Sequence, residues 1–426
     1  MKRTLLAMAL LLTSVFGVTG CGSDDDVQVE TRINNSAEDN SDLTLDSDKS
    51  SDNDPGDDDD VQVETRINNS AEDNSDLTLD SDKSSDNDPG DDDGSIRYDD
   101  NEPDSYSSGS VIISQPLTVK VFAADDVAES VSEAVLESLN LAADMWGLYW
   151  PVEYWVLGLD PVAGEALVSE FCTRRDVRGE WEYEECMERE AGSEQYSMIE
   201  YQQLGALAVA DNMPFGSAGH NGGFEWGIHR FASTLPWGLA GRFGTPGAED
   251  VKTVLHEYWH AVQHSFISTL DYGKRDSAMG PVWFAEGSAE FMAQYGAAQL
   301  ADQGRMPKVP KGDSPFSYED QMTNKLYNIE NEFSNGCAGR NLSSITEYSD
   351  PCKNVAYDLG AWAIAHLLSD TDVDVLLEDF HPMVERVGWE ETFEIVFGRT
   401  VADLDEEMKR FWELPESEKM AVLPRP

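Results

Sequence analysis

Positive charge is scarce in this sequence. Its 426 residues include 29 Lys and Arg against 83 Asp and Glu, which gives a formal net charge of −54 at pH 7. Proteins that bind nucleic acids or anionic membrane surfaces use clustered Lys and Arg to neutralise phosphate charge. The composition therefore excludes nucleic acid as an expected partner and disfavours binding to an anionic lipid surface.

Long apolar runs are lacking as well, apart from one at the N-terminus. A helix needs about 20 apolar residues to span a bilayer, and the run Leu5–Phe16 is too short for that. Two basic residues precede it and Val18-Thr19-Gly20-Cys21 follows, a pattern typical of a secretory signal peptide over residues 1–21. The ending resembles a bacterial lipobox. This resemblance implies a lipid anchor on Cys21 and a lipoprotein of the cell envelope. Because Gly22 follows, it also implies sorting to the outer membrane if the cell is Gram-negative.

Residues 22–110 contain no Trp or Phe and are rich in Asp, Ser and Asn. Val27–Asp59 recurs almost letter for letter as Val61–Asp93, with a period of 34 residues. The repeat lacks the apolar positions that a stacked repeat must bury. We therefore expect a disordered acidic tether, extended by charge repulsion, and no calcium loop of the EF-hand type.

Cysteines are few. After Cys21 the chain has four, none with the C-x-x-C spacing of a cysteine zinc site. An even number in an exported protein indicates two disulfides, for which three connectivities are possible. Pairing between neighbours closes short polar loops and is the expected arrangement: Cys172 with Cys186, and Cys337 with Cys352.

Histidine is scarce too, yet three of the seven histidines lie within nine residues. His256-Glu257-Tyr258-Trp259-His260 is an H-E-x-x-H motif inside Ala248–Phe266, a segment with helical apolar spacing. On a helix, positions i and i+4 lie about 6 Å apart along one face. Both imidazoles can then bind one Zn²⁺, with Glu257 as the base for a water. The alternative is a coincidental match on a surface helix.

Catalytic zinc requires a third protein ligand. His264 lies about 12 Å along the helix from His256, too far to share the ion, and is expected to be exposed or to support a ligand. The remaining candidate is Glu286 in Trp283-Phe284-Ala285-Glu286-Gly287-Ser288-Ala289-Glu290, which begins a second predicted helix, Val282–Tyr295. Glu290 shares its face and can accept the ring N–H of a ligand histidine. Alternatively, both glutamates are solvated helix charges.

The motif W-F-x-E-G-x-A-E downstream of H-E-x-x-H resembles the gluzincin metallopeptidases, the clan of thermolysin and the membrane alanyl aminopeptidases. The resemblance covers roughly residues 250–415. It implies Glu286 as the third zinc ligand and Glu290 as the support of a histidine. Tyr357-Asp358-Leu359-Gly360-Ala361 is similar to the Y-x-x-G-A of the aminopeptidase branch, which implies that Tyr357 donates to the oxyanion. The second candidate for that donor is His229, on a predicted strand.

The expected fold class is α+β and zincin-like, with the active-site cleft between two halves. Residues 111–247 form a mixed half with a small sheet, and residues 248–426 form a mostly helical half that binds zinc. The elements predicted beyond those named above are strands Leu117–Ala123, Val152–Leu157 and Gly227–Thr234 and helices Asp125–Trp146 and Asn354–Ser369. Three segments are predicted as loops: Asp211–Trp226, Asp271–Pro281 and Gly296–Asn324. His366, on the last helix, faces away from Tyr357 and is expected to be a packed histidine.

These features predict a membrane-tethered zinc peptidase that acts on a peptide or protein substrate. Two alternatives remain. The first is a zincin-fold lipoprotein that retains metal but serves a binding or interaction role. The second is a structural lipoprotein in which the motif is a coincidence.

Overall fold

The computed structural model describes residues 116–426 except 193–195, 214–215, 221, 224–225, 244–246 and 309–315. The predicted signal peptide, Cys21 and the acidic tether lie outside the described residues. Among the described residues, no helix has the length and apolar character needed to cross a membrane.

The N-terminal half contains a four-stranded sheet in the order β1-β2-β4-β3. Its strands are β1 (Val119–Ala123), β2 (Val152–Val156), β3 (Ala218–His220) and β4 (His229–Ser233). β1, β2 and β4 are parallel, whereas β3 runs antiparallel to β4. The three predicted strands are confirmed. The prediction of a loop over 211–226 was wrong at β3, which is only three residues long and is formed by pairing with β4 rather than by a local pattern.

The sheet is covered on both faces, which explains why all five residues of β2 are buried. Glu153 and Trp155 face α2 (Pro161–Val177), where they contact Arg174 and Phe171. On the opposite face lie Tyr154 and His229. Both point towards α5 (Gly247–Ser265), the helix that carries H-E-x-x-H.

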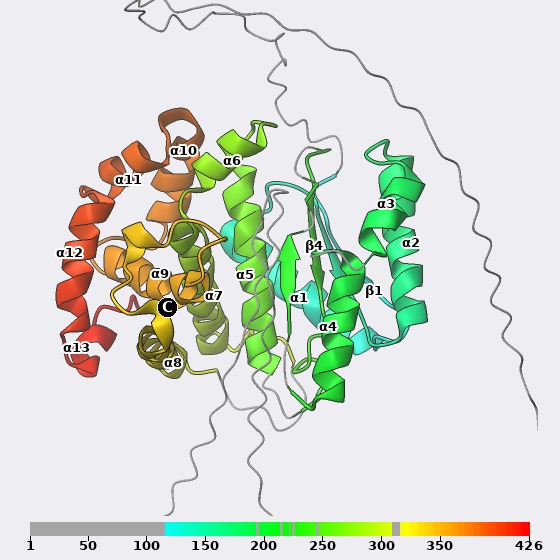
Figure 1. Ribbon diagram of the computed structural model, residues 1–426, viewed down its shortest axis with the longest axis horizontal. Coiled ribbons are helices and arrows are strands. Elements are labelled where there is room, and N and C mark those ends of the chain that lie inside the picture. The colour runs from blue at the N-terminus through cyan, green and yellow to red at the C-terminus, as the bar shows by residue number, and fades with distance from the viewer. Residues whose placement is uncertain are drawn as a thin grey trace, which may run out of the picture. The chain divides into compact units, whose positions relative to one another are not determined.

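Helix α5 lies between the sheet and the C-terminal helices (Figure 1). It packs on α1 (Glu129–Trp146) on one side and on α7 (Val282–Asp302) on the other. A helix covered on both sides is buried around most of its circumference, and His264 is only 2% exposed. Of the two alternatives predicted for His264, exposure is therefore wrong, because a single stripe of apolar residues does not show whether the other face is covered as well.

Helix α7 packs most extensively on α9 (Lys353–Leu368), and two glycines allow the close approach. A Cβ on Gly360 would lie 2.1 Å from the carbonyl oxygen of Trp283, and one on Gly287 would lie 2.5 Å from the Cα of Gly360. No side chain fits there. The contact places the start of α9, with Tyr357 and Asp358, beside the segment of α7 that carries Glu286.

Two predicted loops contain helices. α7 continues through 296–302, and α8 (Tyr318–Glu332) begins inside the predicted 296–324 loop. Gly296 does not interrupt α7, because a Cβ there would lie 2.8 Å from the ring of Trp146, so the glycine makes room for that ring. α6 (Tyr272–Met279) occupies the predicted 271–281 loop and is capped by the side chain of Asp271, which accepts a hydrogen bond from the backbone of Lys274.

Further helices complete the structure: α3 (Tyr183–Glu190), α4 (Met198–Ala210), α10 (His381–Val387), α11 (Trp389–Phe397), α12 (Val401–Trp412) and α13 (Glu416–Met420). Short π- or 3₁₀-helical turns are η2 (Phe333–Cys337), η3 (Leu342–Ser344) and η4 (Leu376–Phe380). The fold class is confirmed as a mixed four-stranded sheet with helices, followed by a mostly helical half. The predicted disulfides Cys172–Cys186 and Cys337–Cys352 are both present, which indicates an oxidising compartment.

Candidate metal centre

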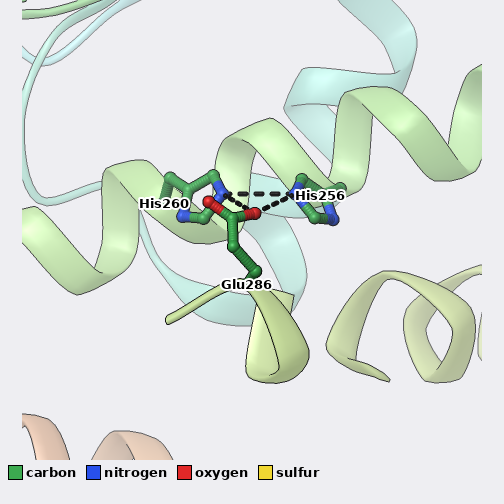
Figure 2. A group of neighbouring side chains, drawn as sticks. All are labelled: His256, His260 and Glu286. Atoms are coloured by element: carbon green, nitrogen blue, oxygen red, sulfur yellow. Dashed lines mark hydrogen bonds and ion pairs between the residues drawn. The ribbon is translucent and has the colours of Figure 1, made fainter. Parts of the chain in front are cut away.

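His256, His260 and Glu286 form one compact group (Figure 2). The histidines lie one turn apart on α5, and Glu286 reaches them from the first turns of α7. The Oε2 atom of Glu286 is 3.2 Å from Nε2 of His256 and 3.3 Å from Nε2 of His260. The two Nε2 atoms are themselves 3.2 Å apart. One ligand atom from each residue therefore points to a common centre.

These separations fit a metal ion. In a tetrahedral site with bonds of about 2.0 Å, neighbouring ligand atoms lie about 3.3 Å apart. The three observed distances of 3.2, 3.2 and 3.3 Å agree with that value. Two imidazole nitrogens and one carboxylate oxygen are ligands that several divalent metals accept. The group could therefore hold a metal ion.

Each histidine is oriented by a hydrogen bond at its other ring nitrogen. Nδ1 of His256 lies 3.0 Å from Oε2 of Glu290, and Nδ1 of His260 lies 2.7 Å from Oε1 of Gln263. Since both partners accept, each Nδ1 donates its proton and leaves Nε2 with a lone pair. This arrangement is typical of histidines that bind metals.

Two buried lysines hold Glu290 in place. Lys252 on α5 lies 2.9 Å from Oε1 of Glu290, and Lys325 on α8 lies 2.6 Å from the same oxygen. Lys325 also donates to Asp358 on α9, at 2.8 Å. Four helices are thus joined by charged hydrogen bonds behind the imidazoles.

The ionisable side chains of this region carry a net negative charge, which favours binding of a cation. It contains four carboxylates and two lysines: Glu257, Glu286, Glu290, Asp358, Lys252 and Lys325. When all six are ionised their net charge is −2, which a divalent cation would balance. Burial makes an uncompensated charge expensive. Bringing a metal to this site would therefore relieve an electrostatic cost rather than add one.

Without a metal, protons take over part of this compensation. Burial opposes the charged form of His256, but its hydrogen bonds to Glu286 and Glu290 raise its pKa to about 9. Burial likewise opposes the charge on Glu286, yet His260 and His256 hold the pKa of that carboxyl well below its usual range. The pKa of Glu257 is raised, chiefly by burial.

Glu257 lies between the two histidines in sequence, and this residue is 1% exposed. Neither of its oxygens has a hydrogen-bond partner in the described part of the chain. A buried carboxylate without partners is costly in free energy. It is therefore an acceptor available to a water or to a substrate group at the site.

The structure brings one of the two predicted oxyanion donors to the group. The ring of Tyr357 stacks on that of His256, with centroids 6.3 Å apart and planes 18° apart. His229 instead stacks on Trp150, and its Nε2 lies 3.1 Å from Oγ of Ser265. His366 pairs with Glu407, at 3.3 Å, away from the group as predicted.

Four residues of the site do not stand out in the sequence: Lys252, Gln263, Lys325 and Tyr348. The hydroxyl of Tyr348 donates to Oε1 of Glu286 at 2.6 Å. Lys252 precedes His256 by one helical turn, so its position on the same face could have been noticed. Lys325 and Tyr348 come from distant segments without a motif, and only the packing of α8 and of the 337–352 loop brings them here.

The cleft predicted between the two halves does not expose the ligand group. His256 is 1% exposed, His260 5% and Glu286 0%. Comparison of the chain with protein-family models, with curated proteins and with solved structures finds no match in any of the three.

Proposed function

We propose that the protein is a zinc-dependent peptidase. The observation that carries the proposal is the convergence of His256, His260 and Glu286, whose ligand atoms lie within 4.8 Å of one another. Zn²⁺ is the proposed ion because it favours tetrahedral sites made of histidine nitrogens and one carboxylate, with a fourth position left for water. The H-E-x-x-H motif in its predicted helical context supports the same choice.

Zinc bound at this group would lower the pKa of a water and polarise the substrate carbonyl. Glu257 is the proposed general base. Its partnerless carboxylate accepts a proton from the attacking water and then delivers it to the amine of the leaving peptide. Its raised pKa makes the carboxylate a stronger base for the first of these steps.

Tyr357 is the proposed donor to the oxyanion that forms on the substrate carbonyl. It stacks on His256 and belongs to the N-terminal part of α9, which the contact between Gly287 and Gly360 holds against α7. A donor fixed in advance stabilises developing charge without reorganisation. Glu290 keeps His256 in the tautomer that presents Nε2.

The proposed location is the cell envelope, with the chain anchored through a lipid on Cys21, sorted to the outer membrane and separated from it by the acidic tether. The two disulfides support an oxidising compartment. The substrate class is a peptide or protein. The excess of negative charge, −54 in the whole chain, disfavours nucleic acid.

One observation favours the alternative of a metal-retaining protein with a binding role. The ligand residues are at most 5% exposed, so a peptide reaches them only after the surrounding segments move. A protein that uses the metal to stabilise its fold would not need such movement. Both functions predict bound metal, but only the peptidase predicts cleavage of a peptide.

Glu257→Gln tests the proposal. The substitution keeps the size of the side chain and both ligand histidines but removes the base. We expect one zinc per chain in both proteins and cleavage of unfolded casein by the wild type only, with the loss in rate on the order of 100-fold or more. Zinc without cleavage by the wild type would favour the binding role, and a folded protein without zinc would refute the metal centre.

A further inference from the structure

The two oxygens of Glu286 have different partners. Oε2 faces the imidazoles of His256 and His260, whereas Oε1 accepts a hydrogen bond from the hydroxyl of Tyr348. At 2.6 Å, this bond has the length of a charge-assisted bond between a hydroxyl and a carboxylate. Glu286 is 0% exposed, so water cannot readily replace the tyrosine.

Tyr348 lies in the segment 337–352, in the irregular stretch between η3 and α9. Several contacts nevertheless fix this segment. The Cys337–Cys352 disulfide closes it over a sequence separation of 15 residues. Arg340 pairs with Asp350 across it and also donates to the carbonyl of Ser344, at 2.6 Å.

The segment is also fastened to two neighbouring helices. The buried carboxylate of Asp405 on α12 accepts from the backbone of Leu342 at 2.9 Å and from the side chain of Asn341 at 3.0 Å. The backbone N–H of Val282, the first residue of α7, donates to the carbonyl of Thr346 at 3.1 Å. Thr346 is two residues from Tyr348, and Val282 is one helical turn from Glu286. The donor and the acceptor of the tyrosine–glutamate bond are therefore tied together through the backbone.

We propose that Tyr348 is a positioning residue for the metal centre and that the disulfide-closed segment 337–352 exists to hold it there. The hydroxyl occupies Oε1, which leaves Oε2 alone turned towards the histidines, so that Glu286 presents a single ligand atom. A carboxylate fixed in this way loses less rotational freedom on binding an ion. The inference rests on the proposed metal centre and adds a residue to which no motif pointed.

The test compares Tyr348→Phe with Tyr183→Phe in the full chain. Both substitutions remove one hydroxyl from a half-buried tyrosine, and Tyr183 bonds Ser169 on α2, at 3.0 Å. Zinc affinity is measured by competition with a chelator, and the coordination is followed by the visible absorption spectrum of the Co²⁺-loaded protein. We expect Tyr348→Phe to lose zinc affinity by roughly 10- to 100-fold and to change the spectrum, as removal of such supporting bonds does. Tyr183→Phe should match the wild type in both.

The outcomes separate this inference from the proposed function. If wild type and Tyr348→Phe bind zinc equally and give the same Co²⁺ spectrum, the role of Tyr348 is refuted while the metal centre stands. If the wild type binds no metal, both fail. Cleavage activity does not enter either decision.

The role of the disulfide is tested by a cycle of variants. Cys337→Ser with Cys352→Ser should lower zinc affinity, whereas the matched change at Cys172 and Cys186 should not, because that disulfide joins α2 to α3. Combining the first pair with Tyr348→Phe should lower affinity little beyond Tyr348→Phe alone, since both act on one bond. Losses that simply add would show that the segment affects the metal independently of Tyr348. If the cysteine variant does not fold, the Tyr348→Phe measurement still decides the main claim.

Discussion

The structure contains two groups of buried histidines, and helix α5 contributes to both. In the first, His256 and His260 face the carboxylates of Glu286 and Glu290. The second consists of His220, His229 and His264, whose ring centroids lie 5.2–6.3 Å apart. All but His220 are at most 5% exposed, so burial alone does not distinguish the groups.

The difference lies in the charges around them. In the second group, Nη1 of Arg275 lies 3.5 Å from Nδ1 of His264, and Trp150 stacks on His229. Burial first, and then the neighbouring cations, lower the pKa of His220 and His264 well below the usual value, and the pKa of His229 falls to about 3. In the first group, carboxylates raise the pKa of His256 to about 9. Carboxylates attract a cation to an imidazole and an arginine repels it, so only the first group suits a metal.

The largest expected effect is the loss of zinc when a histidine of the first group is removed, compared with its retention when one of the second group is removed. His256→Ala and His264→Ala both remove a buried imidazole from α5 and both leave a cavity. We expect His256→Ala to lose its zinc to dialysis entirely, because one of three ligands is gone, while His264→Ala keeps one zinc per chain. Metal analysis of the folded proteins decides. Loss of zinc from a folded His264→Ala would mean that the two groups function as one.

The next effect is on the stability of the metal-free protein. The two groups make the free energy of unfolding depend on pH in opposite directions. The folded pKa of His229 is depressed from 6.5 to about 3, so its contribution to the free energy of unfolding is present above pH 6.5 and is lost as pH falls towards 3. The folded pKa of His256 is raised to about 9, so its contribution is complete below pH 6.5 and is lost as pH rises through 9. Each change is on the order of a few kcal/mol.

Denaturant unfolding from pH 4 to 9.5, with a chelator present, measures both losses of stability. They form the acid limb and the alkaline limb of the plot of unfolding free energy against pH. His229→Gln should flatten the acid limb and leave the alkaline limb unchanged, whereas His256→Gln should do the reverse. Saturating zinc should abolish the alkaline loss, because a bound ion replaces the proton on His256. An alkaline limb that persists in His256→Gln would assign the titration to another residue.

The first histidine group could be predicted because its parts follow local rules. H-E-x-x-H depends on helical periodicity, and the spacing of Glu286 and Glu290 on the next helix depends on the same period. The paired cysteines likewise lie close in sequence. The second group was not foreseen, since His220 comes from a three-residue strand and His264 from a helix face that the sequence alone does not show to be covered.

The residues around the ligands escaped prediction for the same physical reason. Lys325 reaches Glu290 only because α8 packs beside α7 and α9. Tyr348 reaches Glu286 from an irregular segment held by a disulfide and by Asp405. Such contacts join residues distant in sequence and leave no periodic pattern in it. Local patterns thus predict which residues can bind an ion, while tertiary packing determines how firmly they are held.

The smallest expected effect sharpens the comparison by making the first group resemble the second. Glu290→Gln keeps an oxygen that can accept from Nδ1 of His256 but removes its charge, which leaves Lys252 and Lys325 with less compensation beside the imidazole. The positive environment should weaken zinc binding by roughly 10- to 100-fold. Chelator competition measures the change.

A matched control is available in Glu407→Gln, which alters a second histidine–glutamate pair, with His366, in the helical half. Zinc affinity there should equal that of the wild type. If Glu290→Gln also retains full affinity, the hydrogen bond to Nδ1 of His256 is sufficient and the charge of Glu290 is irrelevant to the metal. The contrast with the second group would then have to come from the remaining carboxylates near His256, which are Glu286 and Glu257. If Glu290→Gln loses zinc affinity and Glu407→Gln does not, the charge of Glu290 at Nδ1 of His256 strengthens metal binding in addition to the ligand Glu286.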